Sequence, residues 1–215
     1  IKENGNPIIF MEIPTYPYDG EYGNSLYSRL TLTIDHFYRR RLHSCIDRIV
    51  LTGGMDINSL WGVKTISVIN GIDFASVNKQ IYRPHSGVNI GCIAKFSPWH
   101  GYERIIKGLY NYYSNIHNCE VNLIMVGDGE EKNYYESLVK EYHLEEHVLF
   151  KGRLTGKKLD DVYNVIDVGA CSFGRYKSKI KIIGDLKSRE FMAKGIPMIC
   201  GCGIDVLENR KFDYA

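Results

Sequence analysis

The residue pattern best suited to chemistry is a glycine followed by a short charged segment, at residues 184–197. Gly184 precedes a candidate helix whose first turns carry Lys187, Arg189 and Glu190, and a Gly-Ile-Pro sequence ends it. The first N–H groups of a helix have no acceptor within the helix and lie at the positive end of its dipole. Anions, and phosphate groups above all, bind at such a position. This segment therefore predicts an anion site.

Four more glycine-containing loops follow apolar strand candidates in the second half of the chain. Three of them carry cations, including Lys95, Arg153 and Arg175, and the fourth contains Gly127 and Gly129. A diphosphate needs backbone N–H donors and positive charge at one point, so the joint placement of these loops predicts a binding cleft. Neither a GxGxxG nor a GxxxxGK[ST] sequence occurs, so the sequence does not predict a dinucleotide or NTPase site.

The first half offers a tyrosine- and proline-rich loop at residues 14–21 and three arginines at residues 39–41. Aromatic faces beside carboxylates suit a sugar-facing cleft, although a rigid surface loop is the alternative. The arginines suit contact with an anionic membrane surface or a lipid-linked diphosphate. Three charges are weak evidence for such contact, and a solvated basic face is the favoured interpretation.

Composition narrows the classes of function. The chain has 215 residues and a formal net charge of +2, which is too small for a nucleic-acid footprint. No apolar run approaches the roughly 20 residues of a membrane span, and no signal sequence opens the chain. Six cysteines lie scattered, several within apolar runs, and predict buried free thiols in a reducing, cytoplasmic compartment. The pair Cys200 and Cys202 lacks the spacing of a zinc knuckle.

Strand and helix candidates alternate in the second half, which predicts an α/β fold with a parallel, doubly wound sheet. The strand candidates there are residues 88–94, 121–126, 148–150, 165–171 and 196–200, and the helix candidates are residues 102–113, 134–142 and 159–166. The first half has strand candidates at residues 6–13, 46–52 and 65–69 and a helix candidate at residues 25–45. Residues 72–87 have the composition of a linker, so we place a domain boundary near residue 85.

Five motifs resemble, in order and spacing, those of the group 1 glycosyltransferases, which are retaining enzymes of GT-B fold also called family 4. The segment E-F-M-A-K-G-I-P at residues 190–197 is similar to their E-x-M-A-x-G-x-P signature. The other four are N-G-I-D at residues 70–73, K-F-S-P-W-H-G at 95–101, V-G-D-G at 126–129 and V-L-F-K-G at 148–152. The resemblance runs from about Asn6 to Gly203. It implies two Rossmann-like domains, with the end of an acceptor domain at residues 1–85 and a C-terminally truncated donor domain at 86–215.

The resemblance also implies roles for individual residues. Glu190 is expected to accept hydrogen bonds from the donor ribose, and Lys95 and His100 stand where relatives carry a phosphate-binding arginine and a lysine. Arg153 is expected to lie against the base. The diphosphate is expected to be held by the loop and helix start, namely Gly184, Leu186, Lys187 and Ser188, together with the turn at Gly127.

Three departures from the family pattern modify these expectations. Ile182 occupies the position of a second glutamate that relatives place near the donor sugar. The nearby segment at residues 174–179 is unusually basic, so Arg175 or Lys177 is expected to supply charge to the diphosphate. Histidine in place of lysine makes the charge at residue 100 depend on pH. No histidine occupies the active-site loop, and the catalytic candidates there are Glu12, Thr15 and Tyr16.

The leading hypothesis is a metal-independent, retaining transfer of a hexosyl unit from a nucleoside diphosphate sugar to a glycan or lipid-linked acceptor, with no cofactor. A nucleotide-sugar epimerase of GT-B fold is a second hypothesis. A non-catalytic nucleotide-binding module, or an inactive excerpt, is a third. Because the chain begins at Ile1 rather than at methionine, we expect an excerpt of a longer protein.

Overall fold

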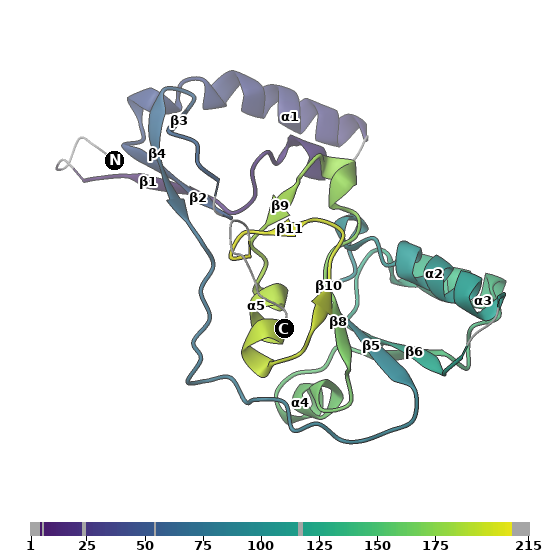
Figure 1. The fold of residues 1–215 in the computed structure, drawn as a ribbon. Helices are drawn as coiled ribbons and strands as arrows, with labels where there is room; N and C mark the ends of the chain where they lie inside the picture. Colours follow the sequence, from purple (N-terminus) through teal and green to yellow (C-terminus); the bar gives the residue numbers. More distant parts are fainter. Residues whose placement is uncertain (1–4, 6, 23–24, 54, 116–117, 208–215) are drawn as a thin grey trace. The chain divides into compact units, whose positions relative to one another are not determined.

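The structure is a computed structural model that describes residues 5, 7–22, 25–53, 55–115 and 118–207. Its chain divides into two compact units, each drawn in Figure 1. The first unit comprises residues 1–70, 178–184 and 203–215, and the second comprises residues 71–177 and 185–202. The chain thus enters the second unit after Asn70, returns to the first at Ser178, and does so again at Gly203.

The first unit is built on a four-stranded sheet in the order β1-β2-β4-β3. Strands β1 (Phe10–Ile13), β2 (Arg48–Thr52) and β4 (Val63–Val68) run parallel, and β3 (Ser59–Leu60) is antiparallel to β4. Helix α1 (Leu26–Arg39) follows β1 and begins where the Ser25 side chain accepts a hydrogen bond from the Ser28 amide. The apolar core of this unit gathers Ile13, Ile49, Leu51, Leu60 and Val63.

A separate pair of parallel strands completes the first unit. Strand β9 (Ile182–Ile183) pairs with β11 (Gly203–Ile204), although neither was predicted from the sequence. Two-residue strands carry too few residues for a recognisable period, so pattern alone misses them.

The 3-10 helices of the described residues, from both units, are η2 (Asp19–Glu21), η3 (Leu42–Ser44), η4 (Pro98–His100) and η5 (Arg175–Ser178).

The second unit confirms the predicted parallel, doubly wound sheet. Its strand order is β10-β8-β5-β6-β7, and every neighbouring pair is parallel. The strands are β5 (Val88–Ile93), β6 (Val121–Val126), β7 (Val148–Gly152), β8 (Val168–Ala170) and β10 (Met198–Ile199). The order reverses at β5, whose two neighbours are β6 and β8, and such a reversal marks the edge where ligands bind.

Helices cover both faces of this sheet. Helices α2 (Glu103–Tyr113) and α3 (Lys132–Glu141) pack on one face against Leu123 and Met125 of β6. Helices α4 (Lys157–Tyr163) and α5 (Leu186–Lys194) pack on the other face against Ile124 and Val126. Side chains of a strand alternate between faces, so burial of both faces explains why β6 is apolar at every position except Asn122.

The unit boundary differs from the one placed near residue 85. Residues 71–87 belong with the second unit because their polar groups bond to it. The Gln80 side chain donates to the carbonyls of Tyr163 and Ile166 at 2.8 and 2.7 Å, and the Lys194 ammonium donates to the Asn78 carbonyl at 3.1 Å. Composition identified the absence of regular structure here, but such long-range bonds leave no mark on composition.

Several predicted elements have shorter or shifted bounds. The strand predicted at residues 165–171 begins only at Val168, because the turn that ends α4 extends to Ile166. The helix predicted over residues 25–45 ends at Arg39 and gives way to η3. Asn6, the first residue of the strand predicted over residues 6–13, lies outside the described residues.

Candidate functional site

Four of the five predicted glycine loops follow β5, β6, β7 and β8 at one edge of the second sheet, whereas Gly184, in the fifth, belongs to the first unit. Backbone bonds tie these loops together: Gly127 N–H donates to the Gly152 carbonyl at 2.8 Å, and Cys171 N–H donates to the Ile199 carbonyl at 2.9 Å. The Phe173 amide likewise donates to the His100 carbonyl at 2.7 Å. The edge is therefore held by direct contacts between loops that are distant in sequence.

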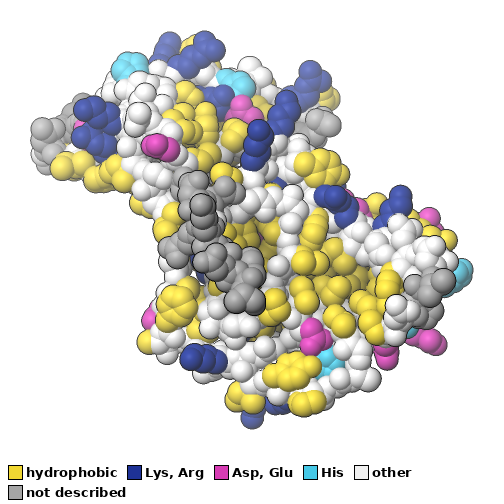
Figure 2. Space-filling model, in the orientation of Figure 1, with side chains coloured by type: hydrophobic (Ala, Val, Ile, Leu, Met, Phe, Trp, Pro, Cys, Tyr) yellow, Lys and Arg dark blue, Asp and Glu magenta, His cyan; other side chains and the backbone are white. Residues whose placement is uncertain are grey.

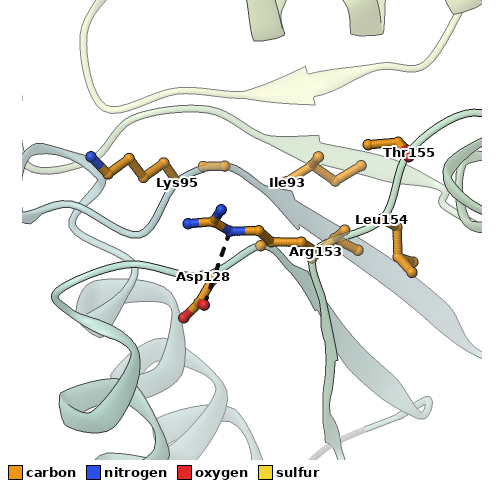
Figure 3. Close-up of a pocket in the computed structure, with 9 residues that line it drawn as sticks. Ile93, Lys95, Asp128, Arg153, Leu154 and Thr155 are labelled. Atoms are coloured by element: carbon orange, nitrogen blue, oxygen red, sulfur yellow. Dashed lines mark ion pairs between the residues drawn. The ribbon is translucent and has the colours of Figure 1, made fainter.

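A pocket of about 380 Å³ opens at this edge (Figure 3). Lys95, Arg153 and Asp128 supply its charged groups, and its other lining residues are Ile93, Ala94, Val126, Gly127, Leu154 and Thr155. The Arg153 Nε lies 4.0 Å from the Asp128 carboxylate, and the two side chains are 74% and 49% exposed. Such an exposed pair is weak, so its charges remain available to a ligand. The pocket brings together three predicted donor-binding residues: Lys95, Gly127 and Arg153.

Gly127 has a packing role that explains its residue type. Its φ is 138°, and a Cβ built on it would lie 1.8 Å from the Ala94 carbonyl oxygen. The loop after β5 therefore crosses the turn after β6 at backbone contact. A glycine is needed here whether or not a ligand binds, so its presence alone is not evidence of donor binding.

The start of α5 lies at the same edge and has its own network. Asp185 is the N-cap, and its Oδ1 accepts a hydrogen bond from the Ser188 amide at 3.0 Å. The Lys187 ammonium points inward, 3.4 Å from Ser172 Oγ and 3.7 Å from Asp185 Oδ2. Burial lowers the pKa of Lys187, and the Asp185 carboxylate opposes that shift. Lys187, the cation predicted to bind the diphosphate, thus already faces the Asp185 carboxylate.

Sequence reasoning overlooked Asp185 and Ser172 as members of this network. Asp185 carried a signal, since an aspartate three residues before a serine at a helix start is typical of an N-cap. Ser172 carried none, because its contact with Lys187 spans 15 residues and depends on how β8 and α5 pack.

His100 lies next to this network as a buried, neutral side chain. Its ring stacks on Tyr102 at 5.5 Å, and its Nδ1 accepts a hydrogen bond from the Ser97 amide at 3.2 Å. Burial, reinforced by the charges of Lys187 and Arg175, lowers the pKa of His100 to about 3. The expected pH-dependent cation is therefore absent near neutral pH in this structure. Arg175 lies nearby with its guanidinium 5.5 Å from the Trp99 ring centroid.

The remaining predicted residues of α5 differ in exposure. Leu186 is 62% exposed, and Ser188 is fully buried. Glu190 is half-buried and lies by the Tyr163 hydroxyl. Burial raises the pKa of Tyr163, and the charge of Glu190 and its hydrogen bond to that hydroxyl raise it further. Glu190 is thus positioned by a buried aromatic residue of α4.

The first unit holds Gly184 and the three catalytic candidates. Glu12 accepts a hydrogen bond from the Thr52 hydroxyl at 3.1 Å, and Tyr16 packs edge-on against Trp61 at 6.2 Å. Thr15, which precedes Tyr16 in the sequence, is half-buried. Gly184 accepts a hydrogen bond from the Asn70 side chain. These contacts assign none of the three candidates a catalytic role.

The tyrosine-rich loop at residues 14–21 is engaged by one arginine. The Arg39 guanidinium pairs with Asp19 at 2.8 Å and with Asp35 at 3.3 Å, and lies 5.0 Å from the Trp61 ring centroid. Its hydrogen bond to Asp19 raises the pKa of Arg39. These contacts join Asp19 of the loop to α1. Because Arg39 is paired with Asp19 and Asp35, its charge is neutralised within the basic run at residues 39–41.

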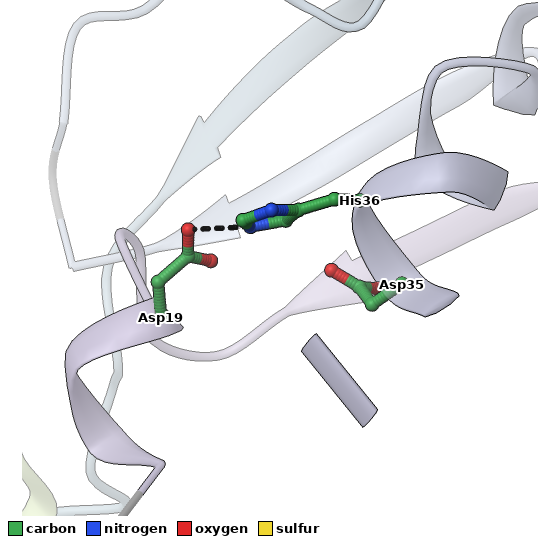
Figure 4. A group of neighbouring side chains, drawn as sticks. All are labelled: Asp19, Asp35 and His36. Carbon is green, nitrogen blue, oxygen red and sulfur yellow. Dashed lines mark hydrogen bonds and ion pairs between the residues drawn. The ribbon is translucent and has the colours of Figure 1, made fainter. Parts of the chain in front are cut away.

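One group in the part of the chain that the structure describes has the composition of a metal site. Ligand atoms of Asp19, Asp35 and His36 all lie within 4.8 Å of one another (Figure 4). Arg39 already bonds to both carboxylates, and His36 Nε2 lies 2.9 Å from Asp19 Oδ2. A guanidinium thus supplies the positive charge that a metal ion would bring, so this cluster fits an ion-pair network.

One family model and several solved structures are similar to this chain. Residues 78–175 match the family model described as glycosyl transferases group 1. No curated protein sequence matches the chain. The structure of sucrose-phosphate synthase from Thermosynechococcus elongatus has a TM-score of 0.67 at 15% identity, covering 96% of this chain and 53% of that one.

Two further structures are similar. HepE from Anabaena, in complex with UDP and glucose, has a TM-score of 0.59 at 16% identity, covering 95% of this chain and 55% of that one. A variant of TarM from S. aureus, in complex with fondaparinux, alpha-GlcNAc-glycerol and UDP, has a TM-score of 0.60 at 13% identity. The match covers 92% of this chain and 37% of that one. This chain therefore spans about a third to a half of the length of these proteins. Residues 78–175 are similar to the group 1 glycosyl transferases, and the chain has the α/β fold of GT-B enzymes.

Proposed function

We propose that this chain is part of an enzyme that transfers a hexosyl unit from a nucleoside diphosphate sugar to a glycan or lipid-linked acceptor, with retention. The observation that carries the proposal is the pocket of Lys95 and Arg153, at the same sheet edge as the start of α5. Two structures of similar fold hold UDP, which makes UDP the first ligand to test.

The proposed mechanism rests on stabilising the departing diphosphate. Negative charge grows on this group as the bond to the sugar breaks, and fixed dipoles and cations at that point lower the barrier. The first amides of α5 provide the dipoles, and Lys187, Lys95 and Arg153 provide the charges. These groups take the part that a divalent ion plays in metal-dependent transferases, so we propose a metal-independent reaction. Activity should survive excess EDTA.

Calorimetry with UDP tests the proposed donor site. The Glu190→Ala variant should lose most of its affinity, because the proposed role of Glu190 is to accept the ribose hydroxyls. Glu146→Ala is the matched control, since Glu146 is an exposed glutamate in the same unit. Equal affinities for wild type and Glu190→Ala would remove Glu190 from the site. A lack of UDP binding by the wild type would favour an inactive excerpt, the other form of the third hypothesis.

The epimerase hypothesis has no observation in its favour. An epimerase needs acid and base groups around the sugar. His100, a histidine at this edge, has its Nδ1 bonded to the Ser97 amide and is 8% exposed. Acceptor-dependent release of UDP distinguishes transfer from epimerisation.

We also propose peripheral contact with the inner face of a membrane, through α1. No helix among the described residues is long and apolar enough to cross a bilayer. Lys and Arg side chains lie over α1 in Figure 2, and several apolar side chains of this helix are exposed. Leu26, Leu30 and Phe37 are 83%, 61% and 56% exposed, and Arg41 lies over the Phe37 ring at 4.6 Å. The fraction that sediments with anionic vesicles should fall for Leu30→Asp, and equal binding of the variant and the wild type would contradict the contact.

All six thiols are free, which fits a cytoplasmic location.

A further inference from the structure

Two cysteines form a close pair at the end of the second sheet. Cys200 follows β10, and its sulfur lies 3.6 Å from the sulfur of Cys202. Both side chains are half-buried, so solutes can reach them, whereas Cys171 beside them is fully buried. The prediction that the thiols are simply buried therefore holds for Cys171 but not for this pair.

The backbone holds the two sulfurs in place. The Ser172 carbonyl accepts a hydrogen bond from the Gly201 amide at 2.9 Å, and it lies 3.6 and 3.9 Å from the sulfurs of Cys200 and Cys202. A Cβ on Gly201 would lie 2.8 Å from the Phe173 Cα, so the glycine between the cysteines packs against that backbone. Both thiols thus share one acceptor and one fixed turn.

The sulfur separation matches bidentate coordination. A thiolate binds a tetrahedral Zn²⁺-like ion at about 2.3 Å, which places two thiolate ligands roughly 3.8 Å apart. The observed 3.6 Å requires little movement of either side chain. The S–S bond of a disulfide is about 2.05 Å long, so forming one would require a much larger movement of the sulfurs towards each other.

The surroundings favour a soft ligand. The Cys171 thiol donates to the Met198 thioether sulfur at 3.7 Å, which makes this end of the sheet rich in sulfur. The thiolate is the form of cysteine that binds metals, and thiolates select soft ions.

We propose that Cys200 and Cys202 form a bidentate dithiolate site for a soft, thiophilic Lewis acid, of the class of trivalent arsenic, Cd²⁺ or Cu⁺. The site is separate from the pocket at Lys95 and Arg153 and does not depend on glycosyl transfer. With an aryl arsine oxide, each sulfur forms one bond to arsenic. The two thiol protons leave with the oxide oxygen as one water, and nothing is oxidised.

Phenylarsine oxide and intact-mass measurement on the reduced chain test the proposal. One phenylarsenic group per chain should remain in excess monothiol, because two bonds hold it, and a dithiol chelator should remove it. The variants Cys200→Ser and Cys202→Ser should each lose the adduct. Cys45→Ser and Cys119→Ser should keep it, since those cysteines are exposed and single. Removal of the wild-type adduct by monothiol, or its retention in Cys200→Ser, would overturn the proposal.

A second measurement on the wild type avoids variants that fail to fold. After treatment with phenylarsine oxide in excess monothiol, peptide mapping should find Cys200 and Cys202 protected from iodoacetamide. Cys45 and Cys119 should remain open to alkylation. Alkylation of Cys200 at the rate of the untreated chain would contradict a bidentate site.

Discussion

The Lys187 ammonium lies 3.7 Å from the Asp185 carboxylate at the first turn of α5. The two side chains are only 13% and 19% exposed, so solvent screens their attraction less than at the surface. Asp185 also caps the helix. A bound diphosphate would therefore compete with Asp185 for both the helix amides and the cation.

Asp185→Asn should strengthen binding of UDP. Asparagine caps a helix about as well as aspartate, so the cap remains while the competing negative charge is lost. We expect a roughly two- to fivefold tighter affinity, the size of a helix-terminus charge effect of about 0.3–1 kcal/mol. Calorimetry measures the change, and Asp161→Asn, on the exposed side of α4, serves as the control. Weaker binding by Asp185→Asn would show that this carboxylate assists the ligand.

Lys187→Gln should weaken UDP binding by roughly 10- to 100-fold, the effect of losing a hydrogen bond to a charged group of about 1.5–3 kcal/mol. Lys107→Gln removes an exposed lysine of α2 and should have no effect. The double variant with Asp185→Asn separates loss of the cation from repulsion by the carboxylate that remains. Equal affinity of wild type and Lys187→Gln would place the diphosphate elsewhere.

The pH dependence of UDP affinity should also involve Lys187. A phosphate binds the protonated ammonium, and burial lowers the pKa of Lys187 below its ordinary value of 10.5. Wild-type affinity should therefore fall as pH rises through that lowered pKa, at a pH where an exposed lysine still carries its charge. Lys187→Gln should remove this part of the profile. An unchanged profile in the variant would assign the titration to another group.

His100 should make stability depend on pH below neutrality. Its pKa is about 3 in the folded chain against 6.5 for an ordinary histidine, so the unfolded chain binds more protons between those values. The contribution of His100 to stability is fully present above pH 6.5 and is lost as pH falls towards 3, with a total on the order of a few kcal/mol. His100→Gln should flatten the unfolding free energy over this window. His143→Asn, at an exposed site, should not.

Gly127→Ala should destabilise the second unit by about 3 kcal/mol or more, since it combines a positive φ with a clash against the Ala94 carbonyl. Gly108→Ala is the matched control, because Gly108 lies in α2 with nothing within 4 Å of an added Cβ. That change should stabilise the chain by about 0.5–1 kcal/mol. Chemical denaturation measures both, and similar values for the two variants would contradict the close loop crossing.

Some elements of the fold could be predicted from the sequence, and others could not. The run at residues 121–126 predicted β6 in full, because burial of both faces leaves an apolar residue at nearly every position. The glycine loops after β5, β6, β7 and β8 lie at one edge as predicted, since parallel strands require it, whereas Gly184 belongs to the first unit. The return of residues 182–183 and 203–204 to the first unit was missed, because their pairing depends on contacts between short segments.

The sequence by itself determined the parallel sheet, the edge where its loops meet and the family motif at residues 190–197. Periodicity and local capping are properties of neighbouring residues, so they can be read along the chain. Only the tertiary structure decided which charges are paired. It set Lys187 against Asp185, kept His100 neutral and brought Cys200 to Cys202 in front of the Ser172 carbonyl. Desolvation and Coulomb interactions depend on what packs around a group, and that is fixed only when distant segments meet.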